Sequence, residues 1–506
     1  MSTIVLTRAR IFSFSEGILE GCLIIRNGVI EDIRTSNECT FPNAKYVDVK
    51  GKTIIPAFID AHAHLFSIAA RYEWVDLSAI PTMEDLKKTL GKIANAIGPG
   101  KWILGYGWDE SKWRDEKRYP TVKDLDEVAP SNPVLIRRID GHLAVVNSMA
   151  LELLNIPDNI RGIDKDSEGR KTGILKEDAL EYAMRKVKYK LESLSKGVLK
   201  VTKMAWEKGV SMSHETFSLE DLSLLSYILD RNEYLGIEFY VFVLEKYIDY
   251  IIDRGLNKLD LGQVRIGGIK VFSDGSIGAR TAALREPYRD DPSNRGMLLK
   301  DKDELTELFK KADKANLQLA IHAIGDRAID TVLEALKEAK VRKELRHRIE
   351  HFELVQEEHI ELVKKLGIVL SMQPNFVGQW QMPGGMYEKR LGKERWRKMN
   401  PFKKLLDAGI LVAFGSDCMP FDPIFGLWSA VNHPIQEYRT SVEEAIKAYT
   451  LNAAYAAHEE KLRGDIKPGN IADLTILSHD LTRINDLRDL RVIGTIIRGE
   501  IRYISY

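Results

Sequence analysis

The chain has 506 residues, which suits one large domain with a smaller companion better than a single ordinary domain. Hydrophobic residues make up 44% and charged residues 29%, so we expect a substantial core, and disorder is not indicated. The 74 basic residues cancel the 74 acidic ones, so the chain has no overall field that would attract nucleic acid or an anionic membrane.

Targeting signals and cysteine pairs are not indicated. Apolar runs such as 54–59 are too short to span a bilayer, and the N-terminus lacks the apolar core of a signal peptide. Cys22, Cys39 and Cys418 show no paired spacing, so neither a disulfide framework nor a cysteine-ligated zinc site is expected. A cytoplasmic location is the default expectation.

Short β-strands are predicted at both ends of the chain. Strand-like runs at 4–6, 22–25 and 29–33 are separated by turn signals such as Arg26-Asn27-Gly28. Similar runs recur at 472–477, 492–497 and 501–504. We therefore expect residues 1–52 and 461–506 to form one composite β-sandwich domain.

Residues 53–460 alternate strand-like and helix-like segments, which is typical of a parallel sheet with crossover helices. Helices are expected at 303–315 and 328–340. The candidate barrel strands are 54–61, 210–214, 237–243, 264–272, 317–323, 348–352, 368–373 and 411–417. The predicted fold class is α/β, a (β/α)8 TIM barrel. The first connection is too long for one crossover, so residues of about 66–205 are expected to form an insertion over the active-site face.

Histidine and aspartate recur where the predicted barrel strands end. His62 and His64 share one face at the end of the first strand, because alternate strand residues point the same way. Further strands end at His322, His351 and Asp417. One such residue is more often a structural histidine, but five at equivalent strand ends indicate a metal site.

Lys270 lies inside an apolar predicted strand. It could reach the rim of the barrel or pair with an acid. Alternatively, a depressed pKa would let it react with carbon dioxide, and the carbamate would be an anionic ligand able to bridge two cations. We favour the carbamate.

An ordered series of motifs resembles the amidohydrolase superfamily, and more narrowly its YtcJ-like branch, which includes N-substituted formamide deformylases. The resemblance covers nearly the whole chain, and the ordered set is specific for the branch but says little about substrate. The motifs are Gly51–His64, Asp140–His142, Thr172–Glu177, Ile269–Ser276, His322–Asp326, Arg348–His351, Ser371–Pro374, Gly415–Asp417 and Pro468–Leu474.

The resemblance implies a barrel with a β-sandwich built from both termini. It implies His62, His64 and Asp417 on one metal, His322 and His351 on a second, and Lys270 bridging as the carbamate. The chain departs from the pattern at Ala57, where glycine is usual, and at Phe352, where a small residue is common.

The predicted reaction is hydrolysis of a carbon–nitrogen bond, in an amide or cyclic amide of a small molecule. A metal-activated hydroxide would attack, with Asp417 as general base and then acid. Histidine and carboxylate ligands suit one or two zinc ions, and manganese or iron is also acceptable. A lactonase or phosphotriesterase-type esterase on the same site is the alternative. An isomerase, or a metal-binding protein without turnover, is less favoured.

The substrate-binding residues are the least determined by the sequence. The resemblance favours His142, Arg280 and Gln373 as substrate contacts, and Trp108 and Asp109 are expected near the metal. Aromatic residues of the insertion and of the loop after the seventh strand, namely Trp108, Trp113, Phe376 and Trp380, would line an apolar pocket or pack in a lid. No nucleic acid or membrane partner is expected, and a homodimer is compatible with the sequence.

Overall fold

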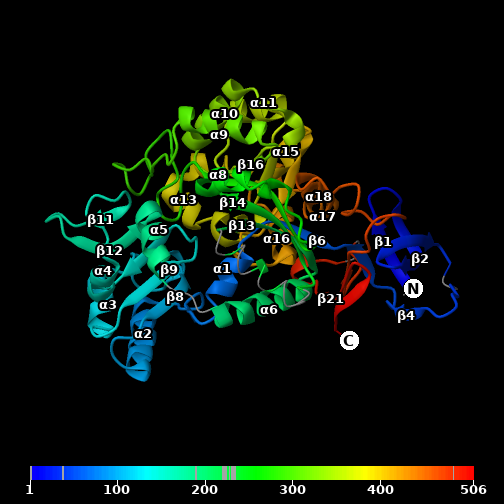
Figure 1. The fold of residues 1–506 in the computed structure, drawn as a ribbon, viewed down its shortest axis with the longest axis horizontal. Coiled ribbons are helices and arrows are strands. Elements are labelled where there is room, and N and C mark those ends of the chain that lie inside the picture. Colours follow the sequence, from blue (N-terminus) through cyan, green and yellow to red (C-terminus); the bar gives the residue numbers. More distant parts are fainter. Residues whose placement is uncertain are drawn as a thin grey trace.

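The computed structural model describes residues 3–36, 39–187, 191–218, 221, 225–226, 228, 235–481 and 484–505. The described chain forms a central barrel, a β sheet made from both ends of the sequence, and an inserted sheet (Figure 1). In Figure 1 the N-terminal strands lie to the right of the barrel and the inserted sheet lies to its left.

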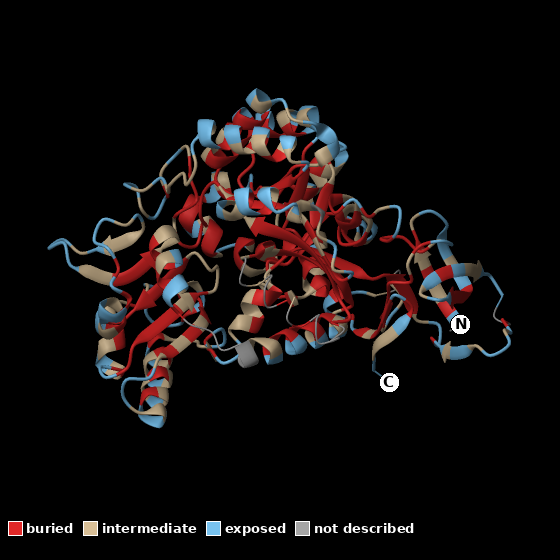
Figure 2. Cartoon of the chain, viewed as in Figure 1, coloured by how far each residue is buried: buried red, intermediate tan, exposed pale blue. Residues whose placement is uncertain are grey.

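The barrel is a sheet of eight parallel strands in the order β19-β18-β17-β16-β15-β14-β13-β6. The strands are β6 Phe58–Ala63, β13 Val210–Phe217, β14 Glu238–Leu244, β15 Val264–Phe272, β16 Gln318–Ala323, β17 Arg348–His351, β18 Val369–Met372 and β19 Val412–Phe414. They are buried almost throughout, as Figure 2 shows, because helices cover the outside of a parallel barrel. Eight strands were predicted at these places, and the predicted TIM barrel is confirmed.

The first and last barrel strands meet where the metal-ligand candidates lie. The backbone N–H of Asp417 donates to the carbonyl of His62 at 2.7 Å. Asp60 on β6 accepts hydrogen bonds from the backbone and the hydroxyl of Ser416. A Cβ at Gly415 would lie 2.3 Å from the backbone nitrogen of His62, so only glycine permits this approach. Together these contacts hold His62 and Asp417 beside each other.

Amphipathic helices cover the barrel. In α9 (Lys302–Lys314), Leu305, Phe309 and Ala312 are buried, and a capping box joins Asp301 and Glu304 at its start. Helix α9 packs against α10 (Asp326–Ala339), and both were predicted to within two residues. Other helices of the barrel are α6 Leu191–Glu207, α11 Glu357–Leu366, α15 Phe402–Asp407, α16 Pro423–Val431, α17 Val442–Ala448 and α18 Leu451–Ala456.

The terminal strands join into one eight-stranded sheet with a core on each face. Its order is β22-β21-β20-β5-β1-β2-β3, with β4 paired to β1. The strands are β1 Thr3–Ser13, β2 Gly17–Arg26, β3 Val29–Arg34, β4 Lys45–Asp48, β5 Thr53–Pro56, β20 Leu474–Leu477, β21 Val492–Ile497 and β22 Glu500–Ile504. Residues 54–56, predicted as the start of the first barrel strand, belong to this sheet because β5 pairs with β20 and β1.

The expectation of no disulfide is wrong. Cys22 on β2 and Cys39 are joined, with their Cα atoms 6.5 Å apart. They are 17 residues apart in sequence, so no short motif marked them, and the sheet brings them together. Both are buried in the small core that also contains Val5 and Ile24.

The insertion forms a six-stranded sheet in the order β11-β12-β10-β9-β8-β7. Its strands are β7 Val75–Asp76, β8 Ile103–Trp108, β9 Val134–Arg138, β10 Leu143–Val146, β11 Ile163–Lys165 and β12 Lys171–Lys176. Its helices are α2 Met83–Ile97, α3 Val122–Val128, α4 Ser148–Leu154 and α5 Glu177–Lys186, and the short α1 Leu65–Ala70 leads into it from β6. Trp108 and Trp113 are buried in a core of its own.

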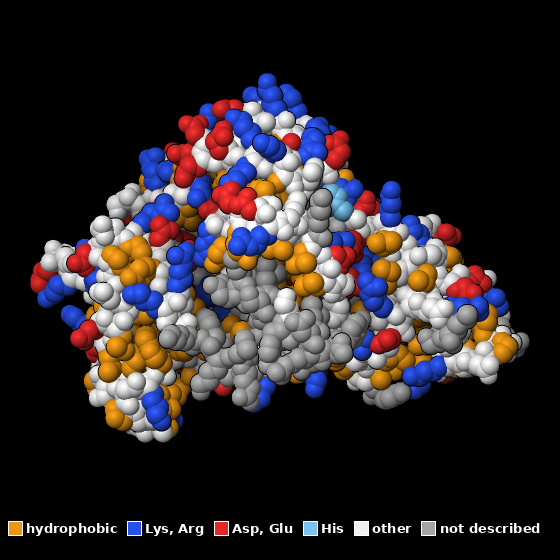
Figure 3. Space-filling view, viewed as in Figure 1, with side chains coloured by type: hydrophobic (Ala, Val, Ile, Leu, Met, Phe, Trp, Pro, Cys, Tyr) orange, Lys and Arg blue, Asp and Glu red, His pale blue; other side chains and the backbone are white. Residues whose placement is uncertain are grey.

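Acidic and basic side chains are interspersed on the face seen in Figure 3, as the balanced composition predicts. Every helix within the described ranges is too short or too polar to cross a bilayer.

Candidate metal centre and active site

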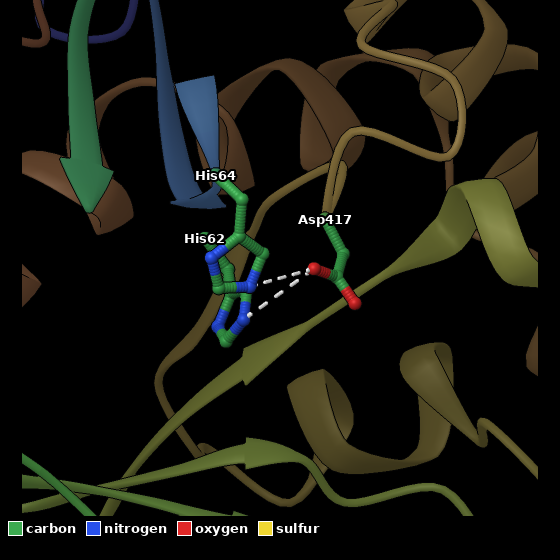
Figure 4. Close-up of side chains that lie close together, drawn as sticks. All are labelled: His62, His64 and Asp417. Carbon is green, nitrogen blue, oxygen red and sulfur yellow. Dashed lines mark ion pairs between the residues drawn. The ribbon is translucent and has the colours of Figure 1, made fainter. Parts of the chain in front are cut away.

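His62, His64 and Asp417 converge at the mouth of the barrel (Figure 4). One ligand atom from each lies within 4.8 Å of the others. The Asp417 Oδ1 atom is 3.0 Å from His64 Nε2 and 3.7 Å from His62 Nε2. Two imidazole nitrogens and a carboxylate oxygen at these separations can share one divalent cation.

The backbone is left-handed at several of these positions. His351 has a φ of 74° and Asp417 a φ of 51°, and the residues that follow each, Phe352 and Cys418, are left-handed as well. Positive φ is unfavourable for residues other than glycine, and such strain tends to gather at functional sites. The chain therefore turns sharply where it presents two of the candidate ligands.

A buried charge network orients His62. Its Nδ1 is hydrogen-bonded to the carboxylate of Glu350, which also binds the guanidinium of Arg348. Arg348 is further held by His214 Nδ1 at 2.9 Å and by the Ser371 hydroxyl at 3.1 Å. Because Glu350 accepts the Nδ1 proton, the Nε2 lone pair of His62 is left free to bind a metal.

Lys270, His322 and His351 lie beside this trio. The ring of His351 is centred 4.8 Å from His62 and 4.4 Å from His322. His322 Nε2 donates to the carbonyl of Gly275 at 3.0 Å, which leaves Nδ1 as its free nitrogen. Lys270 is buried beneath them, with its ammonium 5.1 Å from the ring of Phe272. The second predicted ligand pair and the predicted bridging residue are thus adjacent to the first trio.

The protonation states suit metal binding. Burial, reinforced by Lys270, lowers the pKa of His62 to about 4, and burial lowers the pKa of His322 and His351 well below the usual value. Burial alone would raise the pKa of Asp417, but the hydrogen bond from His64 and the charge of Lys270 help to outweigh burial and lower that pKa. Neutral imidazoles and an ionised carboxylate are the forms that ligate metals.

Two buried atoms of this group make no hydrogen bond of normal geometry, namely His351 Nδ1 and Asp417 Oδ1, although the latter lies 3.0 Å from His64 Nε2. Leaving buried polar atoms without a partner costs free energy, so native proteins rarely do so without a reason. A cation coordinated here would satisfy both atoms. The residues present therefore fit a metal centre.

A narrow pocket opens beside this group, with a cavity volume of about 20 Å³. His322, His351 and Asp417 line one side. Apolar side chains that include Phe376, Trp380, Met386 and Tyr387 line another side. A few polar groups facing apolar side chains are typical of the lining of small-molecule sites.

The insertion contributes His142 to the lining of this pocket, and substrate contact by His142 stays a prediction. Its Nδ1 is 3.0 Å from Glu177, which also accepts from Thr281. Burial would lower the pKa of His142, but Glu177 outweighs burial and raises it to about 9. His142 is therefore a cationic hydrogen-bond donor within the pocket at neutral pH.

The other predicted substrate contacts lie behind the pocket wall. Arg280 pairs with Asp290 at 2.9 Å, and Gln373 donates to the Ser371 carbonyl at 3.2 Å. Trp108 is in the core of the insertion, where its indole donates to the Ile136 carbonyl. Asp109 accepts from the indole of Trp380, which does line the pocket. Substrate contact by these four residues stays a prediction.

Sequence reasoning assigned no role to Glu350, Glu177 or Glu353. Glu350 orients His62, Glu177 orients His142, and Glu353 lines the pocket. One signal was present in the sequence: Arg348 and Glu350 are alternate residues of a short predicted barrel strand, and two opposite charges buried on one face of such a strand are expected to pair.

Comparison with known proteins agrees with this geometry. The amidohydrolase family model matches residues 45–503. Putative amidohydrolase YtcJ of Bacillus subtilis is 33% identical over 96% of this chain and 97% of its own. N-substituted formamide deformylase of Arthrobacter pascens is 28% identical, covering 95% and 94%.

A solved structure is similar over the same extent. It is an uncharacterized metal-dependent hydrolase from Pyrococcus horikoshii, 30% identical over 96% of this chain and 99% of that one, with a TM-score of 0.77. The predicted resemblance is confirmed, and the chain belongs to the amidohydrolase family of metal-dependent hydrolases.

Proposed function

We propose that this enzyme hydrolyses a carbon–nitrogen bond in an amide or cyclic amide of a small molecule. The observation that carries the proposal is the convergence of His62, His64 and Asp417 at the mouth of the barrel, beside His322, His351 and Lys270. The chain's similarity to a protein named as an N-substituted formamide deformylase supports an open-chain amide as the first substrate to test.

The metal-holding residues in this proposal are His62, His64 and Asp417 for one cation, and His322 and His351 for a second. Zinc fits nitrogen and carboxylate ligands best, and manganese or iron is acceptable. Bound divalent cations would supply Lewis acidity, which makes water a stronger acid and a carbonyl a better electrophile.

Asp417 is the proposed general base and acid. The hydrogen bond from His64 and the charge of Lys270 lower the pKa of its carboxyl group, so it is ionised and can accept a proton from an attacking water. It then returns that proton to the leaving nitrogen, which departs as a neutral amine. His142 would donate a hydrogen bond to the substrate's carbonyl oxygen, because Glu177 holds it protonated at the pocket wall.

Lys270 is proposed to carry a carbamate that bridges the two cations. Burial lowers the pKa of its amine to about 8, although Glu350 and Asp417 oppose this effect. A larger free-amine fraction at neutral pH favours reaction with carbon dioxide, and an anionic ligand is more stable than an ammonium beside two cations.

The test combines metal analysis with a substrate panel. Chelation should abolish activity, and the purified enzyme should hydrolyse N-substituted amides or cyclic ureides faster than lactones and phosphotriesters. Full activity in metal-free protein would contradict the proposal, and a preference for lactones would assign the site to ester chemistry.

Lys270→Ala tests the bridging role separately. We expect about half of the bound metal and most of the activity to be lost, and short carboxylic acids to restore part of both by supplying the missing oxygens. Lys270→Met, which has a similar length and no amine, is the matched control and should behave like Lys270→Ala. Retention of the full metal content by both variants would remove Lys270 from the ligand set.

A further inference from the structure

Glu353 is a buried carboxyl group in the wall of the pocket. Its side chain is 1% exposed. The side chains of Tyr387 and Asn400 lie beside the carboxyl group, but neither carboxylate oxygen makes a hydrogen bond of normal geometry. It follows β17 closely, beyond the left-handed residues His351 and Phe352. The mechanism proposed above gives it no role.

Glu353 differs from the other carboxyl groups of the pocket wall. Asp140 accepts hydrogen bonds from Arg138 at 2.7 Å, from Ser276 at 2.7 Å and from the backbone of His142 at 3.2 Å. Asp417 belongs to the metal-ligand group. Glu353 is therefore the carboxyl group of the described pocket wall that is left for a ligand.

The surroundings of Glu353 favour a donor or a cation over an acid. No lysine or arginine is among the described residues that line the pocket. The charge of His142 is matched by Glu177 at 3.0 Å. The aromatic side chains of Phe376, Trp380 and Tyr387 share the wall with Glu353, and aromatic faces attract cations. A negatively charged substrate group beside Glu353 would be repelled by the carboxylates of the pocket wall, and no lysine or arginine of the described wall would offset that repulsion.

We propose that Glu353 is a specificity-determining residue that binds a second, basic nitrogen on the substrate's apolar arm. The preferred substrate is then an amide whose apolar or aromatic arm ends in an amine, and a substrate whose arm ends in a carboxylate is rejected. A donor bound at Glu353 supplies the hydrogen bonds that its buried oxygens lack. This inference rests on the proposed amide hydrolysis.

A matched series of substrates tests the assignment. N-benzylformamide is compared with its para-aminomethyl and para-carboxylate derivatives, with kcat and KM measured for each. We expect the highest kcat/KM for the aminomethyl compound and the lowest for the carboxylate. In Glu353→Gln, the ratio of kcat/KM for the aminomethyl compound to that for N-benzylformamide should fall at least about tenfold, the effect of a charged hydrogen bond, and mainly through KM.

Glu358→Gln is the matched control. It makes the same chemical change five residues later, on the exposed side chain that pairs with Arg285, and it should leave the ratio unchanged. Metal content and melting temperature of both variants are measured alongside. If Glu353→Gln does not fold, Glu353→Asp is used instead. It shortens the side chain by one methylene, so it should also lower the kcat/KM ratio of the aminomethyl compound to N-benzylformamide.

Binding measured without turnover separates this assignment from the proposed reaction. The probes are 4-methylbenzylamine and 4-methylbenzoate, titrated calorimetrically into the metal-loaded protein. If no amide is hydrolysed but the amine binds wild type at least tenfold more tightly than Glu353→Gln, the proposed reaction fails and the assignment of Glu353 stands. If wild type prefers the neutral or acidic compounds, or if Glu353→Gln keeps the preference for the amine, the assignment is overturned.

Discussion

Two groups of buried charged side chains lie on either side of Asp140, and they differ in how completely their polar atoms are hydrogen-bonded. Around Arg138, which is fully buried, the guanidinium donates to Glu110, Asp140 and Asp109, so each charge has a partner. In the pocket, His351 Nδ1, Asp417 Oδ1 and both oxygens of Glu353 make no hydrogen bond of normal geometry. Both groups are buried, and the unmet bonding capacity of the carboxyl groups lies in the second.

This difference in hydrogen bonding distinguishes charged side chains that stabilise the fold from charged side chains that bind a ligand. A saturated cluster fixes the position of the insertion strand β9 relative to the loop that contains Asp140 and His142. A cluster whose buried polar atoms lack hydrogen-bond partners lowers the stability of the fold, and it is retained where a bound ligand supplies those partners. Substitutions in the first should therefore act on folding, and substitutions in the second on binding and turnover.

The largest effect is expected from Arg138→Met, which keeps most of the side-chain volume and removes the charge. It leaves Asp140 buried without its cation and Glu110 paired with Arg390 alone, so the free energy of unfolding should fall by about 3–5 kcal/mol. Urea denaturation measures this change. Arg397→Met, on an exposed arginine, is the matched control and should change little. Equal effects of the two substitutions would mean that the Arg138 cluster does not stabilise the fold.

The next effect is expected from Asp417→Asn in the unsaturated group. The amide keeps the shape but cannot accept a proton, so kcat should fall by about a hundredfold or more for any amide that the wild type hydrolyses. The melting temperature should fall less than in Arg138→Met. Steady-state kinetics normalised to metal content provide the measurement. An unchanged kcat would remove Asp417 from proton transfer.

His347 is an intermediate case and should give the smallest effect. Its Nδ1 accepts from the backbone N–H of Leu319 at 2.9 Å, but its buried Nε2 has no partner. Burial lowers its pKa to about 4, below the value near 6.5 expected in the unfolded chain. The unfolded state therefore binds the proton more readily, so this stability is present above pH ~6.5 and is lost as the pH falls toward 4.

At pH 5 the loss from His347 should be about 2 kcal/mol. His347→Asn keeps an acceptor for Leu319 and removes the titration, so its melting temperature should depend less on pH between 7 and 5 than that of the wild type. Parallel pH curves for the two proteins would show that His347 does not contribute to acid sensitivity.

The barrel and the candidate ligands could be predicted because each is encoded locally. A strand buried on both faces appears as an apolar run, and a histidine or aspartate at its end is conspicuous, as at His322 and His351. The boundaries were less exact: Asp417 lies three residues beyond the end of β19, in a turn with left-handed backbone.

Features that depend on distant contacts could not be predicted. The Cys22–Cys39 disulfide depends on how the chain folds back beside β2. The pocket position of Glu353 depends on Tyr387 and Trp380, which come from a later segment. For Trp108 the sequence left both pocket lining and packing in a lid open, and the structure places it in the insertion's own core. A sequence pattern does not reveal which of two cores an aromatic residue fills.

A single residue, Ala57, separates β5 in the terminal sheet from β6 in the barrel. Its backbone N–H donates to the Asp473 carbonyl, and the next N–H, of Phe58, donates to Gly209. Strand β5 is paired on one side with β20, which comes from a much later part of the chain, so the segment that presents His62 and His64 is anchored by a strand that is synthesised long after it. The nascent barrel therefore cannot complete this anchor for its first two ligands until β20 has been synthesised. For the same reason, an engineer could not excise the barrel at residue 460 and expect the metal site to remain intact.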